Sequence, residues 1–581
     1  MTAPVRKATA DTIPEGNRLV RVGGDRGLSL VEKVTWRLRQ MHYRSFLHGL
    51  RLRGRFPLKL LAAPADLWVG EPLIGKALVD GRFDYMGIAI NTNGIRFSAI
   101  HAPLGWLEWL HGFRWLRDAA TVLDHRRGAA IIEPLVQRWL DEYARFDELV
   151  WRPDILGERL INWMTHAPFL LSSSDQVYRS AVLNTLARSG RHLAQTVEKT
   201  PNGLARVKAA AGLIVNGLLL PGGEQRRHVG ERALARGLTE TVLVDGGTIA
   251  RCPSEHLEIV KLLLTVRQVY RDRQIEQPEA LVSALDRMIP ALFGLVLGDG
   301  LLSAAHGGSL GNAQELERIR TITDVATTPL RNGVHCGFQR LDGGDTVAVI
   351  DAGPPPPART GTVSHAGTLS FEFSDGPHRV VVNCGGGRSA GLAMRTDLHE
   401  LLRTTAAHST LVIENLNSTK LRDDGTLGAG VEEVTALRQE SADGVWLDCG
   451  HDGYAGRFGL EHRRRLYLSS DGVDLRGEDQ LVGSTHSRWR KPRAGLSFDI
   501  RFHLGDGVEP TMTADHQGAV LKLPNGVLWA FKARGAKLRV DDSLWVDSLG
   551  KVRRTRQLVL TGDTAEDGAQ VRWSFKRGTR S

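Results

Sequence analysis

The spacing of hydrophobic positions divides the chain into two halves. Between about residue 105 and residue 325, apolar residues recur at i, i+3, i+4 and i+7 in successive segments such as EPLVQRWLDEYARF, GLARVKAAAGLIVNGLLL and SEHLEIVKLLLTVRQVYRDR. This spacing predicts a series of amphipathic helices. Helical hairpins in series pack as a bundle, a solenoid or a closed α/α toroid, and the spacing alone does not choose among the three.

After about residue 326 the pattern changes to alternation. Runs such as TVAVIDAG, TLSFEF, HRVVVNCG, RRRLYLSS and KLRVDDSLWV alternate apolar with polar residues and are separated by turns rich in Gly, Asp and Asn. This pattern is typical of an antiparallel β-sandwich, and we expect no helix to interrupt it. Helices in one block and strands in the next indicate two separate domains instead of an interleaved α/β fold.

The length of 581 residues supports the same division, because one hydrophobic core rarely serves more than about 300 residues. We predict a disordered lead over residues 1–30, a helical domain over 31–325 and a β domain over 326–581. Between residues 55 and 100, the runs WVGEPLIG and FDYMGIAINTNGIRF favour short strands or extended connections over helices.

Charge narrows the choice of partner only slightly. The chain has 75 Lys and Arg against 65 Asp and Glu, a net charge of +10. An excess of this sign suits an acidic polysaccharide, a nucleic acid or an anionic membrane, but it also describes a basic surface that meets only solvent. No motif of a nucleic-acid-binding fold accompanies the charge, so we expect no nucleic-acid partner.

Cysteine usage and hydropathy exclude several classes of protein. Cys252, Cys336, Cys384 and Cys449 are widely spaced, which argues against a zinc ribbon or a disulfide scaffold. No run of 18 apolar residues is present, so we expect no transmembrane helix. The first thirty residues lack the apolar core of a secretory signal peptide. Nothing in the sequence indicates the oligomeric state.

Five segments carry a resemblance to a known family. They are PNGLARVKAAAGL from residue 201, DGGTIARCPSEH from 245, VSHAGTLSFEF from 363, VVVNCGGG from 380 and TAAHSTLVIEN from 405. In their order along the chain they resemble the motifs of the bacterial heparinase II/III family of polysaccharide lyases. The resemblance implies an N-terminal incomplete α/α toroid packed on a C-terminal antiparallel β-sandwich. It also implies a cell-envelope or periplasmic setting, whereas the missing signal peptide leaves the cytoplasm open.

The resemblance implies an activity as well, the β-elimination of a uronate-containing acidic polysaccharide by a carbon–oxygen lyase. This reaction needs a group that neutralises the uronate carboxylate, a base for the adjacent carbon-bound proton and an acid for the leaving oxygen. Asn202 matches the neutralising position, and Glu255 and His256 are the candidates for proton transfer.

Three of the family's catalytic positions are substituted. Gly203 and Val363 stand where the family has His, and Glu255 stands where it has Tyr. The alternative hypothesis is therefore a catalytically degenerate protein of the same fold that binds a glycan without cutting it. Capping explains Asn202 and Glu255 equally well, because each precedes or opens a predicted helix, and His256 has a capping or solvated alternative.

The resemblance also assigns binding residues. Arg206, Lys208 and Arg251 are the basic groups expected to attract the polymer. The family's structural zinc falls on His365, Asn383 and His408, where Asn383 replaces the usual Asp. Zinc prefers Cys, His and carboxylate ligands, so neutral Asn383 is a poor third ligand. The alternative for His365 and His408 is a buried, hydrogen-bonded histidine in the sandwich.

Overall fold

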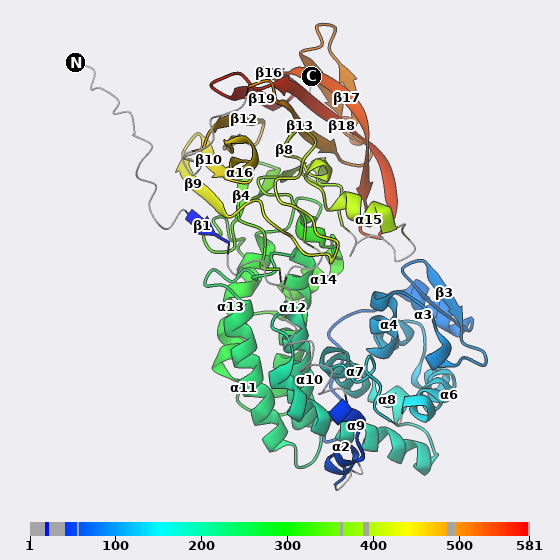
Figure 1. Cartoon of the computed structure of the whole chain (residues 1–581). Helices are drawn as coiled ribbons and strands as arrows, with labels where there is room; N and C mark the ends of the chain where they lie inside the picture. Colours follow the sequence, from blue (N-terminus) through cyan, green and yellow to red (C-terminus); the bar gives the residue numbers. More distant parts are fainter. Residues whose placement is uncertain are drawn as a thin grey trace.

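A computed structural model shows a helical half followed by a β half (Figure 1). It describes residues 18–21, 41–54, 57, 59–143, 145–358, 360, 364–386, 394, 396–484 and 494–578. The β half lies against the ends of α12 and α13 and the helix α14 (Figure 1). The last long helix before the β half ends at Ile322 and the first strand of the sandwich begins at Phe338, on either side of the predicted boundary.

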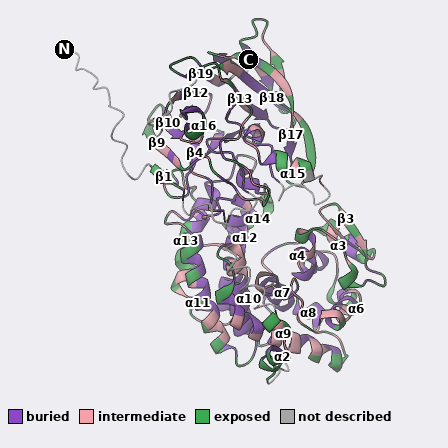
Figure 2. Ribbon diagram, viewed as in Figure 1, coloured by how far each residue is buried: buried purple, intermediate pink, exposed green. Residues whose placement is uncertain are grey.

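The helical half is built from the amphipathic segments that the sequence predicts. Its helices are α2 (Phe46–Arg51), α3 (Pro72–Val79), α4 (Leu104–His111), α5 (Trp115–Ala120), α6 (His125–Tyr143), α7 (Pro153–Thr165), α8 (Ala167–Leu170), α9 (Gln176–Thr196), α10 (Leu204–Leu219), α11 (Glu224–Thr241), α12 (Pro253–Asp272), α13 (Glu279–Phe293) and α14 (Ala313–Ile322). Helix α10 is central, since it packs against α7, α9, α11 and α12, and Figure 2 shows α7 and α10 to be largely buried.

Helices α7 and α10 meet backbone to backbone through two glycines. A Cβ atom on Gly212 would lie 2.3 Å from Cα of Gly157, and one on Gly157 would lie 2.2 Å from the carbonyl oxygen of Lys208. No side chain fits in these positions, because real Cβ contacts are longer than 3 Å. The close approach fixes the spacing of the two helices that carry Glu158 and Lys208.

Tryptophans form much of the helical core. Trp139 and Trp163 pack edge to face with ring centroids 5.7 Å apart, and Phe113 packs on both. Such pairs stabilise beyond the area that they bury. All six Trp residues between 106 and 163 are buried, with exposed fractions of 4% or less. They are therefore core residues and are not laid out on a surface for stacking against sugar rings.

Two N-terminal expectations need correction. Residues 72–79, expected to be extended, form α3, because Glu71 accepts a hydrogen bond as N-cap and Pro72 suits the first turn of a helix. The hairpin β2 (Arg82–Tyr85) and β3 (Ile88–Asn91) confirms the short strands expected nearby. Within the lead predicted to be disordered, Arg18–Val20 forms strand β1 at the edge of a sheet, paired with β9. Residues 1–17 and 22–30 lie outside the described residues.

The β half consists of two antiparallel sheets. One has the order β1-β9-β10-β11-β12-β19-β16-β15-β14, and the other has the order β17-β18-β13-β7-β6-β5-β4 with β8 paired to β13. The strands are β4 (Phe338–Gly343), β5 (Thr346–Asp351), β6 (Phe371–Asp375), β7 (His378–Val382), β8 (Leu411–Ile413), β9 (Glu433–Ser441), β10 (Gly444–His451), β11 (Leu460–Ser469), β12 (Asp474–Gly483), β13 (Ser497–Leu504), β14 (Glu509–Met512), β15 (Gly518–Lys522), β16 (Leu528–Arg534), β17 (Lys537–Val546), β18 (Val552–Asp563) and β19 (Ala569–Arg577).

Short helices do interrupt these strands, contrary to expectation. They are α15 (Thr396–Leu402) and α16 (Ala455–Phe458), and each is too short to leave the clear hydrophobic period that identifies longer helices. Gly459 ends α16 with a φ of 71°, which a glycine adopts without strain.

A buried ion pair lies inside the sandwich. Arg464 and Asp479 are both fully buried, with Nε of Arg464 2.7 Å from Oδ1 of Asp479. His462 and the indole of Trp573 donate to the same carboxylate. Arg464 also donates to the carbonyl oxygen of Leu369, which precedes strand β6 of the other sheet. The pair therefore joins the two sheets through the core.

Candidate functional site

The turn before α10 and the first turn of α12 lie close together. Asn202 is exposed in that turn, and Gly203 is the N-cap of α10 with a φ of 95°. Glu255 is buried in the first turn of α12, and a Cβ atom on Gly203 would lie 3.7 Å from its Oε1. The fold thus places Glu255 beside the turn that contains Asn202. Because Gly203 is the N-cap, the capping alternative for Asn202 is wrong.

His256 has a different environment from the one expected. Its ring is 1% exposed, and Nε2 lies 2.9 Å from the carbonyl oxygen of Met288 on α13. Burial lowers the pKa of His256 to about 4, although the Met288 carbonyl opposes the shift. The imidazole therefore joins α12 to α13 as a neutral donor. It neither caps a helix nor meets solvent, and it cannot face a substrate without leaving the core.

The two basic residues on α10 are already paired. Arg206 donates to the carbonyl oxygen of Thr200 and to Glu240, the latter at 2.9 Å. Lys208 lies 3.3 Å from Oε2 of Glu158. Both side chains are nearly nine-tenths buried. A polymer that bound either cation would have to compete with a protein acceptor.

Lys208 belongs to a larger group of charges on the helices, here named the helical charge cluster. Glu158 on α7 also accepts from Arg114, and Lys261 on α12 lies 3.4 Å from Glu258. Burial alone would raise the pKa of Glu258, but Lys261, Arg114, Lys208 and Arg117 lower it to about 2. The cluster consists of Asp66, Arg114, Arg117, Glu158, Lys208, Glu258, Lys261 and Glu315.

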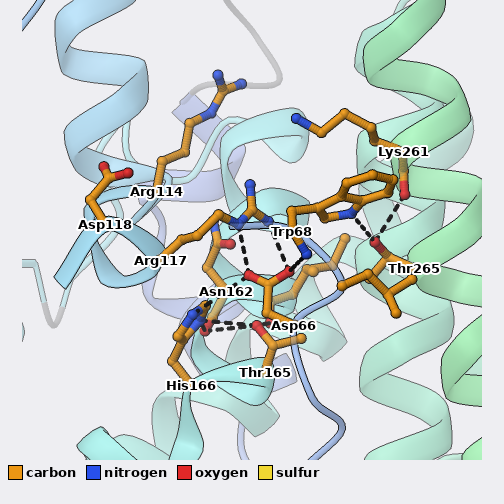
Figure 3. A network of polar contacts seen from close by, with 12 residues as sticks. Asp66, Trp68, Arg114, Arg117, Asp118, Asn162, Thr165, His166, Lys261 and Thr265 are labelled. Carbon is orange, nitrogen blue, oxygen red and sulfur yellow. Dashed lines mark hydrogen bonds and ion pairs between the residues drawn. The ribbon is translucent and has the colours of Figure 1, made fainter. Parts of the chain in front are cut away.

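One end of the cluster is organised around Asp66 (Figure 3). Arg117 donates to Oδ2 of Asp66 at 2.7 Å, and His166 lies 3.5 Å from the same oxygen. Burial would raise the pKa of Asp66, but Arg117 and His166 hold it below its ordinary value. The indole of Trp68 donates to Thr265 of α12 at 3.0 Å, and the Lys261 ammonium lies 5.3 Å from the Trp68 ring centroid. The segment around Trp68 therefore links α5, α7 and α12.

A tyrosine borders the cluster. Tyr85 of β2 stacks on Trp109, with ring centroids 4.6 Å apart and an interplanar angle of 3°. Burial raises the pKa of Tyr85; Glu258 and Glu158 add to the rise, and Arg114 opposes it. The phenol therefore stays protonated at neutral pH and is a proton donor, the residue type that the family uses at the position of Glu255.

Sequence reasoning missed most of this cluster. Its four cations and four carboxylates balance in charge, so no basic run marks them in the sequence. One signal was available: Glu258, Lys261 and Thr265 recur at i, i+3 and i+7, which places polar side chains on one face of an otherwise buried helix.

Arg251, predicted to bind substrate, joins the two halves instead. Its guanidinium pairs with Asp351 of β5 and donates to the carbonyl oxygens of Cys336 and Pro354 at 2.7 and 2.6 Å. His306 lies 3.1 Å from the other oxygen of Asp351. Burial would raise the pKa of Asp351, but Arg251 and His306 lower it to about 2. This Arg251–Asp351–His306 group, here named the interdomain latch, is buried, and all three nitrogens of the Arg251 guanidinium already donate to protein acceptors.

The predicted zinc ligands do not form a metal site. Nδ1 of His365 lies 3.1 Å from Nε2 of His408, and Nδ1 of His408 donates to the Thr404 carbonyl, so His365 donates to His408. Oδ1 of Asn383 accepts from the backbone N–H of Ser409 at 2.9 Å. Among the described residues, no group of three His, Cys, Asp or Glu side chains is placed to hold a metal ion.

Because Asn383 is neutral and already accepts from Ser409, the residues present do not fit the family's zinc, and His365 and His408 form a buried, hydrogen-bonded pair. His365 and His408 are 1% and 2% exposed. Gly367 makes room for this packing, because a Cβ atom there would lie 2.5 Å from the ring of His408. Burial lowers the pKa of His408 to about 4. Val363, the substituted position of a catalytic histidine, lies outside the described residues.

Comparisons with known proteins agree with this architecture. Residues 325–574 match the family model described as heparinase II/III-like, C-terminal. Heparinase III superposes with a TM-score of 0.70 at 14% identity, covering 97% of this chain and 93% of that one. The heparan sulfate lyase HepC from Pedobacter heparinus superposes with a TM-score of 0.61 at 16% identity, covering 95% and 92%.

One relative that is similar along most of its sequence is not named as a lyase. FtsZ-localized protein C from Caulobacter vibrioides (strain NA1000 / CB15N) is 28% identical over 538 residues, which cover 91% of this chain and 92% of the relative. The chain therefore has the heparinase II/III family fold, an α/α toroid on an antiparallel β-sandwich, and its β half is a heparinase II/III-like C-terminal domain. In the part of the chain that the structure describes, no helix has the length and hydropathy to span a membrane.

Proposed function

We propose that this protein is a polysaccharide lyase-like protein that binds an acidic polysaccharide without cleaving it. The observation that carries the proposal is the state of two catalytic positions. Gly203 has no side chain, and the imidazole of His256 is held in the core by the Met288 carbonyl. A base or acid must reach the reacting atoms to act on them.

The helical charge cluster supports binding over chemistry. Glu258 places a carboxylate among Lys261, Arg114, Lys208 and Arg117, which lower its pKa to about 2. The carboxylate of a bound uronate would also be stabilised by several neighbouring cations. Part of the cluster remains accessible, since the Glu258 side chain is 34% exposed and that of Arg114 is 30% exposed. A polymer carboxylate would thus compete with a carboxylate of the protein.

Eliminative cleavage is the second candidate. It is favoured by Glu255, whose carboxylate faces the turn of Asn202 and Gly203, and by the protonated phenol of Tyr85 at the cluster. In this mechanism Asn202 neutralises the uronate, Glu255 takes the proton and Tyr85 protonates the leaving oxygen. We also propose a location in the cell for this protein. The name of the Caulobacter relative, FtsZ-localized protein C, supports a location beside FtsZ.

Ultraviolet absorbance tests both candidates on the full-length protein. Elimination creates a C4–C5 double bond, so absorbance rises during incubation with heparan sulfate, alginate, hyaluronan or pectin if the protein is a lyase. We expect no rise with any polymer and measurable heat of binding with at least one. A rise that Glu255→Gln abolishes would replace the binding proposal with the second candidate. Absence of both binding and cleavage would refute both.

A further inference from the structure

The solvent face of the nine-stranded sheet carries an ordered array of charged and aromatic side chains. Along β11, β12, β19 and β16, buried residues alternate with exposed ones, and the buried set fills the sandwich core. The other set therefore faces solvent across these four strands, which are neighbours in the sheet.

One row across the strands is charged. Arg465 pairs with Asp448 and Arg572 pairs with Glu478, each at 2.6 Å. Glu478 lies opposite both Arg465 and Arg572 in the strand register. The row ends with Arg572 directly opposite Arg534, a like-charge pair that an anion between them would stabilise.

The adjacent row begins with aromatic rings. Trp446 lies opposite Tyr467, with ring centroids 4.5 Å apart, and Tyr467 lies opposite Arg476, whose guanidinium is 5.8 Å from the Tyr467 ring. Trp446 is 42% exposed, unlike the six buried tryptophans of the helical half. Farther along, Ser574 lies opposite Lys532. The row thus leads from an exposed aromatic surface to cations.

The two rows form the floor of a groove of about 680 Å³, bordered by the turn between β14 and β15. Its lining includes five cations (Arg465, Arg476, Lys532, Arg534, Arg572) against the carboxylates of Glu478 and Asp515. Asp448 and Asp474 beside the groove pair with Arg465 and Arg476, so the groove keeps a positive excess of one charge, whereas the helical charge cluster is balanced. Its volume is in the range of sites that hold small ligands.

We propose that this groove is a second binding site, for a carboxylated glycan chain that lies across the strands. Each of the strands β11, β12, β19 and β16 contributes at least one cation to one of the two rows, so carboxylates along the chain can meet a guanidinium or an ammonium. Guanidinium groups bind carboxylates in a bidentate manner, and a sugar ring stacks on Trp446.

An acidic peptide fits this surface less well. Peptides that bind sheets pair with an exposed strand edge, but the groove lies over β12, β19 and β16, each of which has a neighbour on both sides. The proposal does not rest on binding at the helical charge cluster, because the groove belongs to the other half of the molecule.

Calorimetric titration of the full-length protein with oligogalacturonate tests the proposal. The groove variant is Arg476→Ser combined with Arg572→Ser, and Trp446→Ala tests the aromatic surface separately. The matched control is Arg556→Ser on β18, which removes an exposed arginine that is paired with Asp542 in the other sheet. All these positions are at the surface, so circular dichroism should show unchanged folding.

We expect the groove variant to bind at least about tenfold more weakly, Trp446→Ala to bind several-fold more weakly and the control to bind as wild type does. If the groove variant binds oligogalacturonate as tightly as wild type does, the proposal is overturned. This holds even if substitutions in the helical charge cluster weaken the binding. Absence of any binding would also overturn the proposal. Equal binding of poly-glutamate, with the same loss in Trp446→Ala, would assign the groove to an acidic peptide.

Discussion

The Asp351→Asn substitution leaves the buried guanidinium of Arg251 without its carboxylate. The two side chains are 6% and 5% exposed, so water does not replace the lost partner. Breaking a buried ion pair from one side costs about 3–5 kcal/mol. Arg251 keeps the carbonyl oxygens of Cys336 and Pro354 as acceptors, which places the expected loss near the lower end, about 3 kcal/mol.

The pKa of Asp351 gives an independent value for the contribution of this ion pair to the free energy of unfolding. Its fall from an ordinary value of 3.8 to about 2 corresponds to about 2 kcal/mol of stability. Because the folded-state pKa is the lower one, this contribution is fully present above about pH 4 and is lost as the pH falls toward about 2. The difference between wild type and Asp351→Asn should therefore narrow below about pH 4.

Thermal unfolding followed by circular dichroism measures both effects. For a cooperative unit of 150–250 residues, a loss of about 3 kcal/mol lowers the midpoint by roughly 6–12 °C. The control is Asp542→Asn, which removes a carboxylate that is 92% exposed and should change stability by less than about 1 kcal/mol. Equal unfolding midpoints for Asp351→Asn and Asp542→Asn at neutral pH would refute the stabilising role of the interdomain latch. A difference between wild type and Asp351→Asn that does not narrow in acid would refute it as well.

Three further predictions concern packing, the sandwich core and the cluster. Gly212→Ala drives a methyl group into Gly157 and should lower the free energy of unfolding in urea by about 1–3 kcal/mol, whereas Gly456→Ala, which meets no atom within 4 Å, should lower it by less. Asp479→Asn should cost about 3–5 kcal/mol in the same assay, since Arg464 is fully buried, and a loss below about 1 kcal/mol would contradict the buried pair. Glu258→Gln should tighten oligogalacturonate binding several-fold by removing a competing carboxylate, and unchanged calorimetric affinity would argue against binding at the cluster.

The architecture could be predicted because it depends on patterns repeated over many residues. Helical spacing and strand alternation persist over hundreds of positions, so the order of helices and strands follows from them. Short elements such as α15 and β1 have too few residues to show a period, and β1 forms only because β9 offers it a free edge.

The candidate site was less predictable because the sequence gives the type of a side chain but not its partner. Arg251 and His256 stand in motif positions, yet one is bonded to Asp351 and the other to the Met288 carbonyl. Each of these contacts spans at least 32 positions in the sequence. Glu255 lies beside the turn that contains Asn202, because the two residues are next to the starts of neighbouring helices α10 and α12.

The distribution of charge connects the two candidate sites. A net charge of +10 on the whole chain does not appear at the helical charge cluster, where four cations meet four carboxylates. The groove of the nine-stranded sheet has a small positive excess, since five cations meet four carboxylates when Asp448 and Asp474 are counted with their partners Arg465 and Arg476. A protein that only held a polyanion would need the unbalanced surface, whereas a lyase would need free proton-transfer groups in the helical half. This difference agrees with the proposal that the protein holds a glycan on its β half without cleaving it.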